Sequence, residues 1–438
     1  MRLLAALRAV SWRDLAVSVA PFALALVLAV AVTLRFLQPA PPTHLVISAG
    51  PPGSAFEHAA QQYQRILARN GVTLQILASE GSQDNLHRLA DDAGAADIGF
   101  VQGGLADAVP AGPGREGLVS LGSLFYEPLY IFYRGAGPIP TLAALQGRRI
   151  ALGPEGSGTR ALALAVLKAN GVAAPAKVAW AGLGGAAMVQ ALLQGRIEAA
   201  FVMSDSSAPD QVRALLHAPG IRLFNVTQAD AYRRRFRYLG TLELGPGSFD
   251  LGRNLPAAPL TLLAPTVELV ARAGLHPALS DLLIETAREV HGRGGLLHAT
   301  GEFPAPLDHE YAISEDAARF YKSGKSLSYR LLPFWLASLV DRVIVVLVPA
   351  LLVLIPALRL IPGVYAWRIR RRIHRRYAEL MALERRTLQP LDDAQRQGLR
   401  ERLEEIDKSV IDLKIPAAFA DQVYVLREHI GFVRARLQ

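Results

Sequence analysis

Two stretches of the chain are apolar and carry no charged side chain, whereas the long segment between them mixes polar and apolar positions. The first stretch runs over twenty residues, from Leu15 to Leu34, and the second over sixteen, from Val343 to Leu358. A helix needs about 20 residues to cross the roughly 30 Å of hydrocarbon in a bilayer. The pattern therefore predicts membrane-spanning helices over residues 15–37 and, with the apolar residues that follow Leu358, over residues 343–365.

Each apolar stretch has an alternative interpretation. The first could be a cleaved signal peptide, but it is longer than the apolar region of about 7–15 residues in such peptides, and no small-residue cleavage site follows it. The second could be a buried core helix, because it is short for a span. Its prolines, Pro349 and Pro356, are tolerated in membrane helices, and Trp367 beyond it suits the headgroup region. We therefore expect an uncleaved anchor and a second span.

Between the two stretches, short apolar runs typical of strands alternate with stretches in which apolar residues recur at helical spacing. Such alternation predicts an α/β fold with parallel strands. A fresh series begins after residues 124–133, so we expect two lobes within a domain over residues 43–325: about 43–125 with 240–325, and about 127–238. Strands are expected at residues 44–48, 72–77, 98–101, 149–152, 178–180, 199–203 and 221–226. Helices are expected at residues 56–68, 83–90, 159–169, 186–193, 210–217, 266–273, 278–291 and 315–321.

Charge predicts the orientation of the spans. Of the net charge of +9, residues 1–14 contribute +2, residues 365–438 contribute +5, and all the rest only +2. Arginines thus flank each span on the side away from the α/β domain, and such residues favour the cytoplasmic side. We expect residues 1–14 and a helical tail over residues 366–438 in the cytoplasm, with helices at 377–388 and 394–411. The basic residues then indicate a lipid bilayer as partner and no nucleic acid.

Composition and motifs exclude several classes of chemistry. The chain has no cysteine, so it has no disulfide framework, no cysteine-ligated zinc site and no thiol nucleophile. It also has no G-x-S-x-G elbow, Walker loop or H-E-x-x-H motif. The segment GLGGAA at residues 182–187 matches a dinucleotide-binding fingerprint only as an isolated motif, which is weak evidence. We expect no catalytic residue, no metal site and no cofactor.

Two strand-to-helix turns carry the functional signal. They are SAGPPGSAF at residues 48–56 and GPEGSGTR at residues 153–160, at matching places in the two series. Glycines let a ligand approach the backbone, and the free N–H groups at a helix start favour anions. Ligands of open α/β sheets bind beyond the carboxyl ends of the strands, where these turns lie. Each turn alone could be an ordinary cap, but their matched placement predicts a clamp for a carboxylate.

Six segments of the chain follow one another in a recognisable order. They are residues 48–56, 79–86 (SEGSQDNL), 96–102 (ADIGFVQ), 125–134 (FYEPLYIFYR), 145–159 (LQGRRIALGPEGSGT) and 191–201 (ALLQGRIEAAF). In order and spacing they resemble the solute-binding subunits of TRAP transporters, specifically the TAXI group. The turn at residues 48–56 departs from the glycine-rich pattern of that group at Pro51 and Pro52, and the group usually lacks a second span and a tail.

The resemblance implies a two-lobed, periplasmic-binding-protein-like (type II) domain that captures a small organic anion, a dicarboxylate or an acidic amino acid. It implies TRAP-type permease subunits as partners, no enzymatic activity, and a bacterial inner (cytoplasmic) membrane with the α/β domain in the periplasm. The lobes would close about a hinge near residues 125–128 and 238–244. A sensor that signals through the second span and the tail is the alternative.

Candidate ligand-binding residues follow from the turns and from the resemblance. Arg160 is expected to be the best single charge for a carboxylate. The candidates are Ser54, Phe56, Ser82, Asn85, Gln102, Tyr126 and Glu127 before the second turn, and Gly156, Ser157, Gly158, Thr159, Arg160 and Ser204 from that turn onward.

Overall fold

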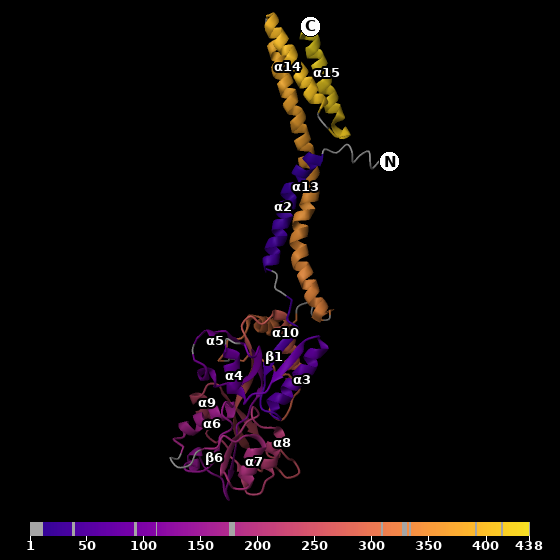
Figure 1. The fold of residues 1–438 in the computed structure, drawn as a ribbon. Helices are drawn as coiled ribbons and strands as arrows, with labels where there is room; N and C mark the ends of the chain where they lie inside the picture. Colours follow the sequence, from indigo (N-terminus) through magenta and orange to yellow (C-terminus); the bar gives the residue numbers. More distant parts are fainter. Residues whose placement is uncertain are drawn as a thin grey trace. The chain divides into compact units, whose positions relative to one another are not determined.

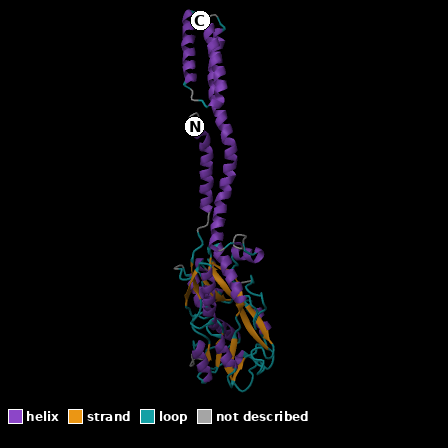
Figure 2. Cartoon of the chain, turned by 90° about the vertical axis from the view of Figure 1, so that its right-hand side faces the viewer, coloured by secondary structure: helices purple, strands orange, loops and turns teal. Residues whose placement is uncertain are grey.

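The computed structural model describes residues 12–36, 40–91, 94–110, 112–174, 180–307, 310–325, 331–332, 334–389, 392–412 and 415–437. The chain forms two compact units. One unit is Ala40–Ser338, and the other combines Met1–Pro39 with Leu339–Gln438. The first is a mixed α/β unit and the second is helical (Figure 2).

The larger sheet of the α/β unit has the order β2-β1-β3-β10-β4, with β9 paired to β10. Figure 1 labels β1 of this sheet. Strand β1 is parallel to β2 and β3, so that Ile47 lies opposite both Ile76 and Ile98. Strand β10 is antiparallel to β3, β4 and β9. The strands are β1 (His44–Ser48), β2 (Thr73–Leu77), β3 (Ile98–Gln102), β4 (Leu118–Tyr126), β9 (Leu239–Leu244) and β10 (Leu260–Arg272).

Helices cover both faces of the larger sheet. One core surrounds the aromatic side chains of Phe56, Tyr63 and Phe100, and a second core holds Leu86 and Leu89 of α4. Both faces are therefore buried, as parallel strands with helical crossovers require. The helices are α3 (Ala55–Arg69), α10 (Pro277–His291) and α11 (Glu315–Ser323) at the first core, and α4 (Ser82–Ala90) and the short α5 (Pro113–Glu116) near the second.

The smaller sheet has the order β6-β7-β5-β8. Strand β6 is parallel to β7, and β5 is antiparallel to β7 and β8. Helix α6 packs in one core through Leu162 and Val166, and α7 packs in the other through Met188 and Leu192. The elements are β5 (Tyr130–Arg134), β6 (Ile150–Ala151), α6 (Gly158–Ala169), α7 (Gly185–Leu193), β7 (Ala199–Val202), α8 (Pro209–Leu216), β8 (Ile221–Leu223) and α9 (Ala229–Arg235).

The chain crosses between the sheets at two places. The first crossing joins β4 to β5 at Glu127 and Pro128, as expected from the sequence. The second lies within β10: Leu263 bridges to Leu129 and packs in a core of the smaller sheet, whereas Val267 packs in the core of the larger sheet. The return therefore occurs near residues 264–267 and not at 238–244, because β9 and the first half of β10 pack with the smaller sheet.

The helix expected at residues 266–273 is wrong. These residues belong to the strand β10, which pairs with β3, β4 and β9. A strand buried on both faces reads as a continuous apolar run, and periodicity alone does not separate such a run from a buried helix. The strand expected at residues 178–180 lies mostly outside the described residues, and next to it Ala181 forms a bridge to Ala151.

The helical unit contains both apolar stretches. Helices α2 (Trp12–Phe36) and α13 (Phe334–Thr387) each hold a segment long and apolar enough to cross a membrane. Near the start of α2, the carboxylate of Asp14 pairs with Arg368 at 3.3 Å and with Arg372 at 2.6 Å. The two helices therefore lie side by side and antiparallel, which brings the two arginine-flanked ends together.

Beyond the apolar segment, α13 continues as one helix of a bundle with α14 (Asp393–Ile411) and α15 (Ala420–Leu437). The separate helix expected at residues 377–388 is thus the last part of α13, while the helix expected at 394–411 matches α14. Helix α15 was not predicted. The bundle has its own core, which includes Leu380, Leu403 and Leu426.

Candidate functional site

Both glycine-rich turns lead into helices, as the sequence predicts, and each provides a helix cap. Ser54 begins α3 and accepts a hydrogen bond on Oγ from the N–H of Glu57 at 3.2 Å. Ser157 begins α6 and accepts one from the N–H of Arg160 at 3.1 Å. Each serine is buried. The hydroxyl groups of Ser54 and Ser157 are therefore engaged as N-caps.

The start of α6 already holds an anion from this chain. The carboxyl group of Asp205 accepts hydrogen bonds from the N–H of Gly158 at 2.6 Å, from the N–H of Thr159 at 3.3 Å, and from Thr159 Oγ1 at 2.5 Å. Asp205 is fully buried. The position predicted for a solute carboxylate is thus filled by a side chain that sequence reasoning missed.

Glu127 lies beside Asp205 at the first crossing between the sheets. Its Oε1 accepts hydrogen bonds from Ser204 Oγ at 2.6 Å and from the N–H of Asp205 at 2.7 Å. Burial and the nearby Asp205 raise the pKa of Glu127 well above its ordinary value of 4.5. Burial also raises the pKa of Asp205, although hydrogen bonds from Thr159 and Ser206 lower it in part. Glu127 and Ser204 therefore position the 204–205 loop.

Hydrogen bonds to backbone carbonyl groups join the second turn to the part of the unit that contains the larger sheet. The amide of Gln102 donates from Nε2 to the carbonyl oxygen of Gly158 at 3.1 Å, and the N–H of Asp84 donates to the carbonyl oxygen of Gly156 at 2.9 Å. A Cβ on Gly158 would lie 2.3 Å from Gln102 Oε1, so a side chain there would displace the Gln102 amide. The residues predicted to clamp a solute do come together from the two sheets. They contact one another directly, and not through a solute between them.

Asn85 and Ser82 act within the larger sheet. Asn85 Oδ1 accepts from Ser48 Oγ and from Ser79 Oγ, both at 2.6 Å. Its Nδ2 donates to the carbonyl oxygens of Ala49 at 2.6 Å and of Phe100 at 2.8 Å. All four hydrogen-bonding positions of the amide are thus used. Ser82 Oγ accepts from the N–H of Gln102 at 3.2 Å. Asn85 has no polar atom left for a solute.

The remaining candidates lie apart from one another. Phe56 is fully buried and stacks edge-on with Phe100 at 5.5 Å between ring centroids, so it is a core residue. Tyr126 stacks edge-on with Phe303 at 5.0 Å. Arg160 is half-buried on α6, and its Nη1 lies 3.8 Å from where Gly182 would carry a Cβ. The residues predicted to form a single clamp are therefore helix caps, core residues and an arginine that lies apart from them.

A cavity of about 190 Å³ lies where the two sheets meet. The turn that contains Ser54 lines it from the larger sheet. The starts of α7, at Gly184 and Gly185, and of α8, with Ser206, Ser207, Ala208 and Gln211, line it from the smaller sheet. Pro51, Pro52, Gly53, Glu80 and Pro154 complete the lining. Three helix N-termini therefore approach one polar cavity. Among the predicted site residues, only Ser54 lines this cavity.

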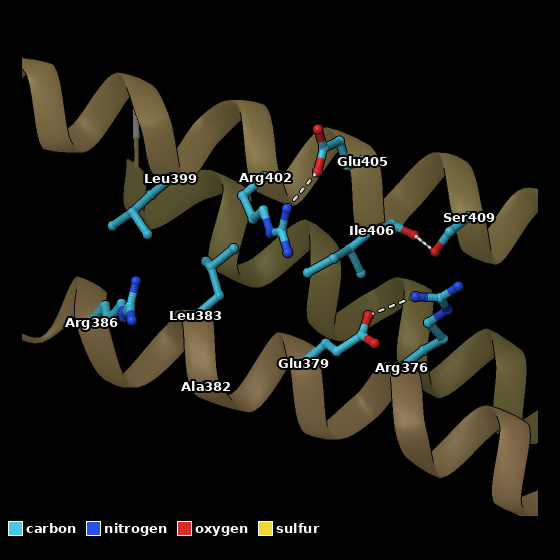
Figure 3. Close-up of a pocket in the computed structure, with 10 residues that line it drawn as sticks. All are labelled: Arg376, Glu379, Ala382, Leu383, Arg386, Leu399, Arg402, Glu405, Ile406 and Ser409. Carbon is cyan, nitrogen blue, oxygen red and sulfur yellow. Dashed lines mark hydrogen bonds and ion pairs between the residues drawn. The ribbon is translucent and has the colours of Figure 1, made fainter.

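A second cavity, of about 390 Å³, lies between α13 and α14 in the helical unit (Figure 3). Four of its five charged side chains pair locally: Arg376 with Glu379 at 2.7 Å and Arg402 with Glu405 at 3.1 Å. Ser409 donates to a backbone carbonyl of its own helix. Because these polar groups satisfy one another, the cavity between the sheets is the better candidate for a solute. Within the described residues, no group of three or more His, Asp or Glu side chains could hold a metal ion.

Part of the α/β unit matches the model of a known family. A model of the NMT1-like family matches residues 47–239. This segment contains both glycine-rich turns, Glu127 and Asp205, but it is less than half of the chain. No curated protein matches the chain.

Several solved structures are similar to part of this chain. The structure of CAE31940 from Bordetella bronchiseptica RB50 is 16% identical, with 58% of this chain and 72% of that chain covered and a TM-score of 0.39. The periplasmic aliphatic sulphonate binding protein SsuA from Escherichia coli is 18% identical, with 57% and 73% covered and a TM-score of 0.35. XAC2383 from Xanthomonas citri, bound to chloride ion, is 16% identical, with 61% and 92% covered and a TM-score of 0.37.

Proposed function

We propose that this chain is a membrane-anchored solute-binding protein, and that its α/β unit binds a small organic anion in the cavity between the two sheets. The cavity at the starts of α3, α7 and α8 carries the proposal. Backbone N–H groups at helix starts attract anions, and the hydroxyl groups of Ser206 and Ser207 add short polar contacts. The match of residues 47–239 to the NMT1-like family supports a binding role over catalysis.

The two apolar helices support the anchor. Asp14 pairs with Arg368 and Arg372, so the basic flanks of both helices lie at the same end of the pair. Basic flanks favour the cytoplasmic side, which supports a periplasmic position of the α/β unit at a bacterial inner membrane. Delivery of the solute to a TRAP-type permease is the output that we propose.

A sensing role is the second candidate, and the tail favours it. A simple tether has no need of a folded module, yet α13, α14 and α15 bury a common core that includes Leu380 and Ile430. In a sensor, this bundle would carry the signal of solute binding into the cytoplasm.

The test of solute binding uses the full chain in lipid nanodiscs and titration calorimetry with a panel of dicarboxylates and amino acids. We expect at least one to bind, and Ala208→Phe to weaken that binding at least about tenfold, or roughly 1.4 kcal/mol, because the ring enters the cavity. The matched control is Ala257→Phe, at an exposed position outside the cavity lining, which should leave affinity unchanged. Equal affinities in both variants would place the solute elsewhere.

A further inference from the structure

Asp205 sits where two parts of the α/β unit meet. Three donors of α6 point at its carboxyl group, which lies at the position where the second glycine-rich turn was expected to bind a solute acid. Since Thr159 Oγ1 and the N–H groups of Gly158 and Thr159 all donate, both oxygens of Asp205 act as acceptors. That arrangement suits the ionised carboxylate at a helix N-terminus.

The larger sheet packs directly on the same residue. A Cβ on Gly81 would lie 2.6 Å from Asp205 Oδ2, and a Cβ on Gly50 would lie 3.0 Å from the carbonyl oxygen of Asp205. Gly81 also has a φ of +128°, which disfavours any side chain there. Two glycines thus allow the backbone of the larger sheet to approach the Asp205 loop at van der Waals distance.

Glu127 holds this loop from the crossing between the sheets. It accepts from the N–H of Asp205 and from Ser204 Oγ, so the backbone on the N-terminal side of Asp205 is fixed as well as its side chain. The hydrogen bonds from Gln102 to Gly158 and from Asp84 to Gly156 then join the two sheets on either side of Ser157.

We propose that Asp205 is a built-in anion that takes the place of a solute acid group at α6 and keeps the two sheets closed together without a solute. A second consequence rests on the proposed function. A solute acid group binds at the starts of α3, α7 or α8, and its binding does not require closure of the sheets. Asp205 therefore determines which solutes bind, because it occupies one of the helix starts that would otherwise hold an acid group of the solute.

The test measures the distance between the sheets in the full chain in nanodiscs. Because the native chain has no cysteine, Gln62→Cys on α3 and Gln190→Cys on α7 give two unique, exposed sites for spin labels. Without any added solute, we expect one narrow distance distribution. Asp205→Ala should add a longer-distance population, and formate or acetate should reduce that population by filling the vacated position. Chloride at equal ionic strength should not.

Stability gives an independent measurement of the same substitution. Asp205→Ala leaves buried donors without an acceptor, so we expect the Tm to fall by roughly 4–10 °C and formate to recover part of the loss. Asp281→Ala is the matched control: it removes a buried carboxylate that pairs with Arg319 at 2.7 Å, so formate should give no recovery of closure or Tm beyond that of chloride. If Asp205→Ala does not fold, Asp205→Asn keeps the size and one acceptor, and it should open partially without a response to formate.

Three results would overturn the proposal: a broad distribution in the parent chain without solute, a single short distance in the Asp205 variants, or an open population of Asp205→Ala that ignores formate. These outcomes are independent of solute titration. A chain that binds no solute in the panel but stays closed through Asp205 would contradict only the proposed function.

Discussion

At the scale of single residues, two carboxyl groups determine the chemistry of the boundary between the sheets. Glu127 and Asp205 are both fully buried, and each follows a strand that leads into that boundary. Two buried carboxyl groups this close do not both ionise readily, because charge repulsion adds to the loss of hydration. The donors of α6 surround Asp205, whereas Oε2 of Glu127 has no hydrogen-bond partner within the described residues. Of the two carboxyl groups, Glu127 is therefore the one that stays protonated.

A pH dependence of stability follows from the raised pKa of Glu127. Above the ordinary value of 4.5, the unfolded chain has lost a proton that the folded chain still binds at Glu127. The free energy of unfolding should therefore fall as pH rises from 4.5, by up to about 1.4 kcal/mol per pH unit, until the folded group also ionises. The raised pKa of Asp205 acts in the same direction.

Glu127→Gln tests this assignment, because the amide keeps the acceptor at Oε1 and removes the titration. We expect the variant to lose less stability than the parent chain between acidic and neutral pH, measured by thermal unfolding across a pH series. Exposed Glu243→Gln is the control and should follow the parent chain. A pH profile of Glu127→Gln that matches the parent would assign the titration to another group.

At the scale of elements, helix α13 contributes both an apolar segment and one helix of the tail bundle. Helix α13 runs through 54 residues, and its apolar segment is followed without a break by residues that pack in the bundle core. In that core, Leu426 of α15 is fully buried together with Leu380 of α13. Residues of α13, α14 and α15 share this core, so the three helices stabilise one another.

Removal of one buried side chain should loosen the bundle. Leu426→Ala is expected to destabilise it by about 2–5 kcal/mol, the usual cost of a buried Leu→Ala change. Limited proteolysis of the full chain should then cut within residues 388–438 faster than in the parent chain. Tyr424→Ala, at a position 69% exposed, is the matched control and should be cut at the parent rate. Equal resistance of both variants would mean that α15 does not depend on this core.

At the scale of the whole molecule, the two units differ in how they bury their apolar residues. The α/β unit buries its apolar residues in several cores, whereas the apolar segments of α2 and α13 leave most of theirs exposed. Exposed apolar helices of this length suit a bilayer. The ion pairs of Asp14 with Arg368 and Arg372 then join the helices at their basic ends.

The proposed topology predicts opposite accessibility for the two units. Leu251→Cys, at a position 89% exposed in the α/β unit, should react in whole cells with a thiol reagent that does not cross the inner membrane. Leu388→Cys, 69% exposed in the tail, should react only after the cells are broken. Labelling of position 388 in intact cells would place the tail outside the cytoplasm and reject the two-span arrangement.

The sequence by itself determined the features that depend on near neighbours along the chain. The apolar stretches in α2 and α13, the alternation of strands and helices, and the helix starts after the two glycine-rich turns were all predicted. Each is a local property, because hydrophobic periodicity, charge-free length and capping chemistry act over a few residues.

Only the tertiary structure decided what these elements meet. Residues 266–272 form a strand because β3 and β4 pair with them, and Asn85 is a structural residue because four distant groups use its amide. The anion at α6 comes from Asp205, which is 46 residues from Thr159 in the sequence. Local sequence showed that α6 would attract an anion, but a free solute and a distant side chain satisfy the same donors equally. The fold selects the side chain because it holds Asp205 at that position in advance, so no freely moving solute has to be ordered there.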